Sequence, residues 1–379
     1  MDYYIRSTGG RIVDLTVAGD PPRTRRSACV PVPRVWMRSP SWDLGWLIGS
    51  AAVVPLGLVA VWSGMSADLI NLGVTLLVGG PHLFSTYLAT YLDPRFRRAH
   101  VPFLVATTLL VPAFVWTLGL LDYQVLLSFF IFAASAHVLQ QNAYLAGVYR
   151  ARSRRREPGW SRWIDWGVLG LSFYPIASWK LARGEFYLGD VQVVIPEVAR
   201  TTAACAAVSV AFAAFVAAWM AKSAWEWRRG TLNAPKTILI AFTGLVAFFI
   251  PLAASGDRME LAFQTVNLWH SIQYLGLVWL ILQLRREHGQ LDSPLLRRLA
   301  GPSAWPFYGA CIAVTAALLG VVVVLARLDP LGIPFGRYYL LGILSALLIH
   351  YVLDAYLFAV SIRPGADASR FPYAGPLRP

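Results

Sequence analysis

The chain is poor in charged residues and in cysteine. Asp, Glu, Lys and Arg together make up 14% of its 379 residues, whereas hydrophobic residues make up 57% and the mean hydropathy is +0.54. A soluble domain carries about 25% charged residues, so this composition predicts a polytopic membrane protein. The three cysteines (Cys29, Cys205 and Cys311) are far apart and form no Cys-x-x-Cys motif. Their spacing argues against a disulfide framework and against a thiolate metal site.

Two further absences narrow the function classes. The first 40 residues are rich in Arg and Pro and contain no apolar run, so no cleavable signal peptide is expected. No polar stretch is long enough to form a soluble nucleic-acid-binding domain. The net charge of +13 is instead explained by basic loops that face anionic lipid headgroups.

Long apolar stretches fill the rest of the chain. A membrane-spanning helix needs about 20 apolar residues, and the sequence predicts ten: 44–63, 69–92, 101–121, 124–149, 163–180, 201–221, 237–254, 261–283, 304–326 and 338–361. The expected fold class is therefore all-α, a transmembrane helical bundle. A basic N-terminal arm (1–43) precedes the transmembrane domain (44–362), which has an external loop at 181–200, and a tail (363–379) follows it.

The distribution of basic residues predicts the orientation of these helices. With the N-terminus inside, 27 of the 33 Lys and Arg residues fall in cytoplasmic segments and 6 fall on the opposite side. Because cytoplasmic loops are enriched in Lys and Arg, we expect ten spans with both termini in the cytoplasm. The expected location is the bacterial inner membrane.

Four of the six histidines lie near the middle of four different apolar stretches. They are His82, His137, His270 and His350, on the second, fourth, eighth and tenth predicted spans. These spans share one direction in the predicted topology, and residue counts from the outer end place the four imidazoles within roughly 6 Å of a common plane. We therefore expect all four to be metal ligands. The other two histidines lie in arginine-rich cytoplasmic segments and are expected to be solvated.

Polar residues accompany the histidines at helical spacing. Gln140 and Gln273 follow His137 and His270 at i+3, which places each pair on one helix face. We expect Gln140, Gln141 and Gln273 to bind around the cofactor and orient the imidazoles, although polar contacts between helices are the simpler alternative.

A buried carboxylate and several aromatic residues complete the expected site. Asp354 lies one turn after His350, and its charge in a bilayer needs a partner. It is a candidate catalytic residue, with direct ligation, support of a ligand and helix packing as open alternatives. Tyr87 and Tyr274 are the other candidate catalytic residues, and with Phe84 and Trp269 they are expected to line an apolar substrate cavity.

This set of residues favours one kind of chemistry. Four neutral imidazoles bind a divalent ion, and six-coordinate iron would keep two positions open, whereas tetrahedral zinc would be saturated. Non-haem iron is the expected cofactor, with haem or copper as alternatives. The expected partners are the bilayer, a hydrophobic small-molecule substrate such as a lipid, dioxygen and an electron donor, with no nucleic acid.

The run Gly79-Gly80-Pro81-His82 on a membrane span, with single histidines on later spans, resembles the bacterial integral-membrane carotene dioxygenases of the Brp/Blh type. The resemblance implies an all-histidine non-haem iron and oxidative cleavage of β-carotene to retinal. It covers the histidine-bearing spans, and Leu83 and Phe84 stand where that family continues with Gly and Asp. The motifs Pro-His-x-x-x-Thr-Tyr, His-x-x-Gln-Tyr-Leu and His-Tyr-x-x-Asp-Ala also resemble a set in uncharacterised bacterial membrane proteins.

Two other function classes remain open at this stage. A haem b or other tetrapyrrole-binding electron-transfer protein would use the histidines as axial ligands, but no span carries the two histidines about 13 residues apart that stacked haems require. A proton-coupled transporter would titrate the histidines and Asp354 along a path, but acidic residues are sparse within the spans. Both fit the sequence less well than an integral-membrane metal-dependent oxygenase.

Overall fold

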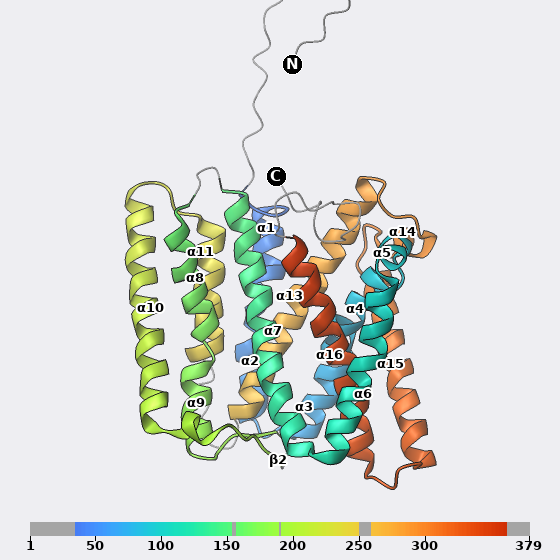
Figure 1. Cartoon of the computed structure of the whole chain (residues 1–379). Coiled ribbons are helices and arrows are strands. Elements are labelled where there is room, and N and C mark those ends of the chain that lie inside the picture. The colour runs from blue at the N-terminus through green and yellow to red at the C-terminus, as the bar shows by residue number, and fades with distance from the viewer. Residues whose placement is uncertain (1–34, 154–156, 189–190, 250–258, 362–379) are drawn as a thin grey trace, which may run out of the picture. The chain divides into compact units, whose positions relative to one another are not determined.

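The computed structural model describes residues 35–153, 157–188, 191–249 and 259–361, and these are almost entirely helical (Figure 1). Most of the predicted N-terminal arm and all of the predicted tail lie outside the described residues, as does Cys29. Among these described residues, seven helices are long and apolar enough to cross a membrane: Pro40–Ala60, Leu72–Thr90, Val101–Leu121, Tyr123–Ala151, Thr202–Arg228, Trp305–Leu328 and Phe335–Phe358. The expected all-α, membrane-embedded character is thereby confirmed.

The helices follow the predicted apolar stretches in order, with several short or irregular segments between the long ones. Their bounds are α1 (Pro40–Asp43), η1 (Leu44–Ile48), η2 (Gly49–Ala52), α2 (Val53–Trp62), α3 (Ala67–Val74), η3 (Thr75–Gly79), α4 (Gly80–Thr90), α5 (Pro94–Ala99), α6 (Val101–Leu121), α7 (Tyr123–Ala151), α8 (Gly159–Leu171), α9 (Tyr174–Ala182), η4 (Glu197–Arg200), α10 (Thr202–Arg228), α11 (Ala234–Gly244), η5 (Leu245–Phe249), α13 (Met259–Glu287), α14 (Pro294–Leu299), α15 (Trp305–Leu328) and α16 (Phe335–Ser361).

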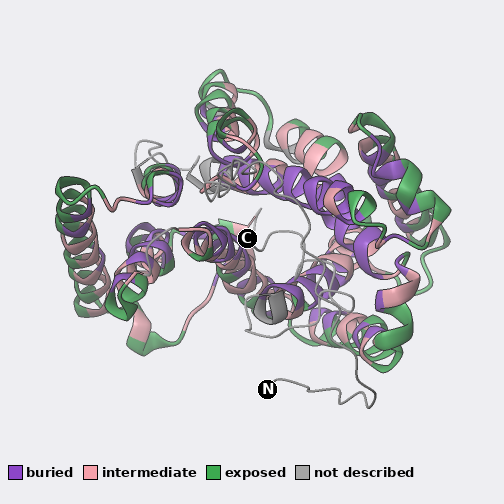
Figure 2. Ribbon diagram, turned by 90° about the horizontal axis from the view of Figure 1, so that it is seen from above, coloured by how far each residue is buried: buried purple, intermediate pink, exposed green. Residues whose placement is uncertain are grey.

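The four histidine-bearing helices, α4, α7, α13 and α16, pack against one another and run in the same direction (Figure 1). Helix α13 is the most deeply buried of them, because nearly every side chain from Thr265 to Arg285 is covered by neighbouring helices. Figure 2 shows that buried residues gather on the helices of this central group, whereas the outer helices expose one face. This packing is the scaffold of the candidate site.

The second predicted span changes helix type just before His82. Residues Thr75–Gly79 form a π-helical turn, and the α-helix restarts at Gly80 with Pro81 in its first turn. A Cβ atom on Gly80 would lie 2.3 Å from the Thr315 side chain on α15. Gly80 therefore permits a close approach of α4 to α15, and π-helical turns are frequent at functional sites.

The fifth predicted span is two helices rather than one. Helix α8 ends at Leu171, and α9 restarts at Tyr174 with Pro175 in its first turn. Both helices pack against α10. Only 6% of the residues in the apolar window of α10 are fully buried within the protein, so most of its side chains are at least partly open to lipid, and it forms the left edge of Figures 1 and 2.

A buried network of ion pairs joins α8, α10 and α11. Lys222 pairs with Asp165, and Lys236 pairs with Asp165 at 2.8 Å and with Glu157 at 2.5 Å. Arg150 reaches the same Glu157 carboxylate at 3.0 Å. The charge count of the sequence assigned both lysines to a cytoplasmic loop at 222–236, but they lie within helices and are fully buried.

The predicted external loop at 181–200 folds back on the helices. It contains a two-stranded antiparallel hairpin, β1 (Tyr187–Leu188) and β2 (Val191–Gln192). Phe186 and Val193, which flank the strands, pack with Ile131 and Phe132 of α7. The loop thus covers one part of α7 rather than extending into solvent.

Candidate metal centre

The four intramembrane histidines converge on one buried point of the bundle. Their side chains are at most 3% exposed. The His82 ring lies 4.5 Å from His350 and 4.8 Å from His270 between ring centroids, and His137 lies 4.8 Å from His350 and 5.0 Å from His270. Four parallel helices therefore bring four imidazoles into contact, as in metal sites built within helix bundles.

Asp354 belongs to the same cluster, and three ligand atoms in it lie close to the separations that a single ion needs. The Nε2 atoms of His137 and His350 lie 3.2 Å apart, and the Asp354 Oδ2 atom lies 3.7 Å from His350 Nε2 and 4.0 Å from His137 Nε2. Two ligands about 2.1 Å from one ion lie about 3.0–3.6 Å apart at bond angles of 90–120°. Small side-chain rotations would bring all three atoms onto one ion.

Thr86 bonds to two members of the triad formed by His137, His350 and Asp354. Its hydroxyl donates to Asp354 Oδ1 at 3.1 Å, so its oxygen can accept the Nδ1–H of His350 at 2.7 Å. That tautomer leaves the Nε2 lone pair of His350 directed at His137 and Asp354. The Tyr274 hydroxyl also donates to Asp354 Oδ1, at 2.5 Å. Both bonds orient the carboxylate and leave its other oxygen available for an ion.

The second group of potential ligands is His82, His137 and His270, whose ligand nitrogens lie within 4.8 Å of one another. Several buried atoms of the cluster lack a hydrogen-bond partner among the described residues: Nδ1 of His82, Nδ1 of His137, both ring nitrogens of His270 and Oδ2 of Asp354. Each buried polar atom left without a partner costs about 1–3 kcal/mol. A bound cation would satisfy those that face it, so the donor set fits a metal.

The glutamines lie beside this cluster and do not bond to its rings. Gln141 donates to the backbone carbonyl of His270 at 3.2 Å and to the side-chain oxygen of Gln273 at 3.1 Å. Gln273 in turn donates to the carbonyl of Leu47. Gln140 is half-buried and forms no hydrogen bond within the described part of the chain. The pair Gln141–Gln273 thus joins α7, α13 and η1, which is the interhelical role that the sequence left as an alternative.

The two tyrosines predicted as catalytic residues lie in different surroundings. Tyr274 is fully buried, and its ring lies 4.6 Å from that of His82. Tyr87 instead donates to the Ala346 carbonyl at 2.9 Å and stacks on Tyr91 at 5.3 Å, so its hydroxyl is engaged away from the triad.

Phe84 and Trp269 are both buried and lie against different neighbours. Phe84 lies 5.5 Å from Tyr87, and Trp269 packs in an apolar cluster with Val138 and Val266. The four predicted cavity-lining residues therefore do not all face one another.

Two residues at the site were not predicted from the sequence. Thr86 is i+4 from His82 and therefore shares its helix face. The sequence shows this spacing, but it led to no predicted role for Thr86. Tyr351 follows His350 directly, and its ring stacks on His137 at 4.3 Å. The spacing of residues along the sequence does not indicate such a contact between two helices.

No protein-family model matches the chain, and no curated protein or solved structure matches it either. The resemblance to carotene dioxygenases therefore stays a prediction based on the motif around His82. Function has to be argued from the cluster itself.

Proposed function

We propose that the chain is an integral-membrane, metal-dependent oxidoreductase that uses non-haem iron to oxidise a hydrophobic substrate dissolved in the bilayer. The observation that supports this most is the triad of His137 Nε2, His350 Nε2 and Asp354 Oδ2, with separations of 3.2–4.0 Å. Two histidines and one carboxylate, with further positions open, form the donor set of non-haem iron(II) oxygenases.

In this proposal the surrounding residues hold the ligands in place. His137, His350 and Asp354 bind the iron, and His82 and His270, whose rings contact those of His350 and His137, supply further nitrogens. Thr86 and Tyr274 fix the carboxylate and the tautomer of His350. Iron bound there would supply the activation of dioxygen.

The surroundings of the cluster favour an apolar substrate. The ligands are at most 3% exposed, and His82, His137, His350 and Asp354 lie within helices whose length and composition suit the bilayer interior. Such burial keeps bulk water from the iron, which limits side reactions of oxidising species. A carotenoid or another lipid could reach the cluster from the hydrocarbon phase, and a polar substrate would have to cross it.

We also propose ten spans with both termini in the cytoplasm, in a bacterial inner membrane. Three regions beyond the seven long apolar helices would complete the count: α8 with α9, α11 with η5, and α13. Helix α13 has 29 residues and is about 44 Å long, more than the roughly 30 Å hydrocarbon core requires. Reporter fusions at Arg183 and Gly230 would place those two sites on opposite sides of the membrane. A result on the same side would refute this topology.

The alternatives fit the cluster less well. Adjacent imidazole rings 4.5–5.0 Å apart are in contact, which leaves no room for a planar macrocycle between them. A haem protein would show a Soret band in its visible spectrum. For a transporter, Asp354→Asn would change a measurable flux, whereas the oxidoreductase proposal predicts loss of metal from the same variant.

Metal analysis of the purified protein tests the proposal. We expect about one iron per chain, and strongly reduced iron in His137→Ala and Asp354→Asn. Gln140→Ala is the matched control, because it lies one turn from His137 on the same helix and forms no hydrogen bond to the cluster within the described residues. Absence of stoichiometric metal from the wild type, or equal iron in all variants, would refute the proposal. Stoichiometric copper would support the metal site and show that its metal is copper rather than iron.

A further inference from the structure

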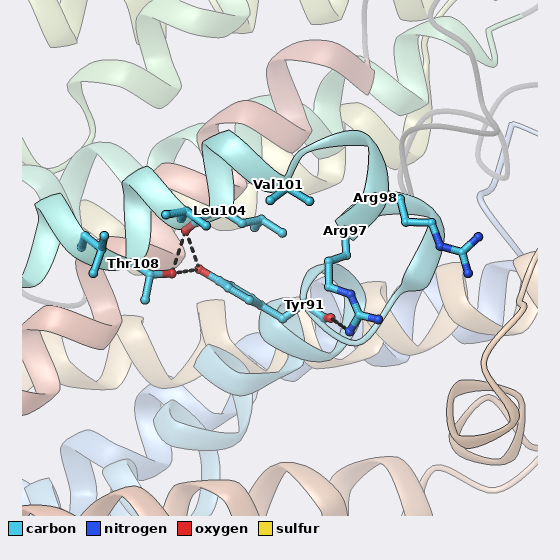
Figure 3. Close-up of a pocket in the computed structure, with 8 residues that line it drawn as sticks. Tyr91, Arg97, Arg98, Val101, Leu104 and Thr108 are labelled. Carbon is cyan, nitrogen blue, oxygen red and sulfur yellow. Dashed lines mark hydrogen bonds between the residues drawn. The ribbon is translucent and has the colours of Figure 1, made fainter.

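A groove of about 410 Å³ lies on the outer surface of the protein, where α4, α5 and α6 meet. It is lined by Tyr91, Arg97, Arg98, Val101, Leu104, Val105, Thr108 and Leu109. This volume is within the range of about 300–1,000 Å³ that is typical of small-molecule sites. Figure 3 shows the two arginines at one end of the groove, Thr108 at the other end and the Tyr91 ring between them.

The walls of the groove are apolar and follow a single helix face. Val101, Val105 and Leu109 lie one turn apart on α6, and they are 48%, 51% and 64% exposed. A stripe at this spacing runs along the helix axis, so its length lies roughly parallel to an acyl chain in the bilayer. The Tyr91 hydroxyl bonds to Thr108 at 2.7 Å and thereby fixes the opposite wall.

The polar end of the groove carries an excess of positive charge. Arg95 on the same short helix is neutralised by Asp292, with bonds of 2.7 and 2.8 Å. Arg97 and Arg98 are exposed and form no ion pair with any residue that the structure describes. The Arg97 guanidinium donates to the Tyr91 carbonyl at 3.2 Å, which holds it at the mouth of the groove.

We infer that this groove is a binding site for an anionic phospholipid, with one acyl chain along the α6 stripe and the phosphate headgroup on Arg97 and Arg98. Charge complementarity selects an anionic headgroup over a zwitterionic one, because the ammonium group of a zwitterionic headgroup cancels the charge of its phosphate and is repelled by the two arginines. Guanidinium groups bind phosphate oxygens through paired N–H donors. The apolar stripe beside them selects a lipid over a free phosphate.

Native mass spectrometry of the full-length protein in detergent, titrated with dioleoyl phosphatidylglycerol or dioleoyl phosphatidylcholine, tests this inference. We expect tighter binding of phosphatidylglycerol, and a loss of about 25-fold in its affinity in the double variant Arg97→Gln/Arg98→Gln, since each basic residue near an anionic lipid surface contributes about fivefold. Val105→Trp should also weaken binding, because the new ring would fill the groove from an exposed position.

The double variant Arg297→Gln/Arg298→Gln is the matched control. These arginines are also adjacent and exposed, on the similar short helix α14, but they do not line the groove. We expect it to bind phosphatidylglycerol as the wild type does. Equal affinity for the two lipids, equal loss in both double variants, or unchanged binding in Val105→Trp would each overturn the inference.

Discussion

Thr86 offers the sharpest test of how the triad is supported. Its hydroxyl accepts from His350 Nδ1 at 2.7 Å and donates to Asp354 Oδ1 at 3.1 Å. Thr86→Val keeps the shape of the side chain and removes both bonds. The metal affinity should fall about 10–100-fold, as for other losses of residues that orient metal ligands, which corresponds to about 1.4–2.8 kcal/mol. The buried imidazole N–H left without an acceptor should also cost about 1–3 kcal/mol of stability.

The assay is an anaerobic competition for iron(II) between the purified protein and a chromophoric chelator. Thr90→Val is the matched control, because Thr90 is also buried on α4 but its hydroxyl donates to the backbone carbonyl of Thr86, at 2.7 Å, rather than to the triad. The control should retain the wild-type iron affinity. Wild-type affinity in Thr86→Val, or the same loss in both variants, would refute the role assigned to the Thr86 hydroxyl.

Two further predictions concern the scaffold, and both are measured by unfolding of the protein in detergent. Lys236→Met should destabilise the protein by up to about 3–5 kcal/mol, because it removes one of the two cationic partners of each buried carboxylate, Glu157 and Asp165, whereas Arg183→Met at an exposed pair should cost no more than about 1 kcal/mol. Equal losses would contradict this role of the network. Gly80→Ala should destabilise by about 1–3 kcal/mol through its clash with Thr315, whereas Gly309→Ala, with open space around it, should stabilise the helix. A stabilising Gly80→Ala would contradict the close approach.

From the sequence one could predict an all-α chain with long apolar helices, and also the four histidines and Asp354 that the structure brings together, but not every residue of the cluster. Hydrophobic stretches located the helices because the bilayer requires about 20 apolar residues for each crossing. The spacing of the histidines within those stretches predicted one layer, and the structure brings the four rings together. The break between Leu171 and Tyr174 was missed, because the flanking residues are apolar throughout and hydropathy does not register an interruption by Pro175.

The hydrogen-bond partners of the polar side chains were harder to predict from the sequence than the places of these residues in the helices. Gln140 and Gln273 share a helix face with a histidine, but a shared face does not decide whether a side chain turns to the ring or to a neighbouring helix. Gln273 turns to the Leu47 carbonyl, and Thr86 bonds to His350 instead. Lys236 was assigned to a cytoplasmic loop because the seventh predicted span begins at residue 237. Its carboxylate partners lie on other segments far away in sequence.

The most direct measurement of the central claim is X-ray absorption at the iron edge of the purified protein, compared with His350→Ala. The proposal predicts only nitrogen and oxygen ligands, at about 2.0–2.2 Å, with outer-shell scattering from at least two imidazoles and a weaker imidazole contribution in the variant. Sulfur ligands, no imidazole scattering, or an identical spectrum in His350→Ala would contradict the claim that His137, His350 and Asp354 hold a metal at this point in the bundle.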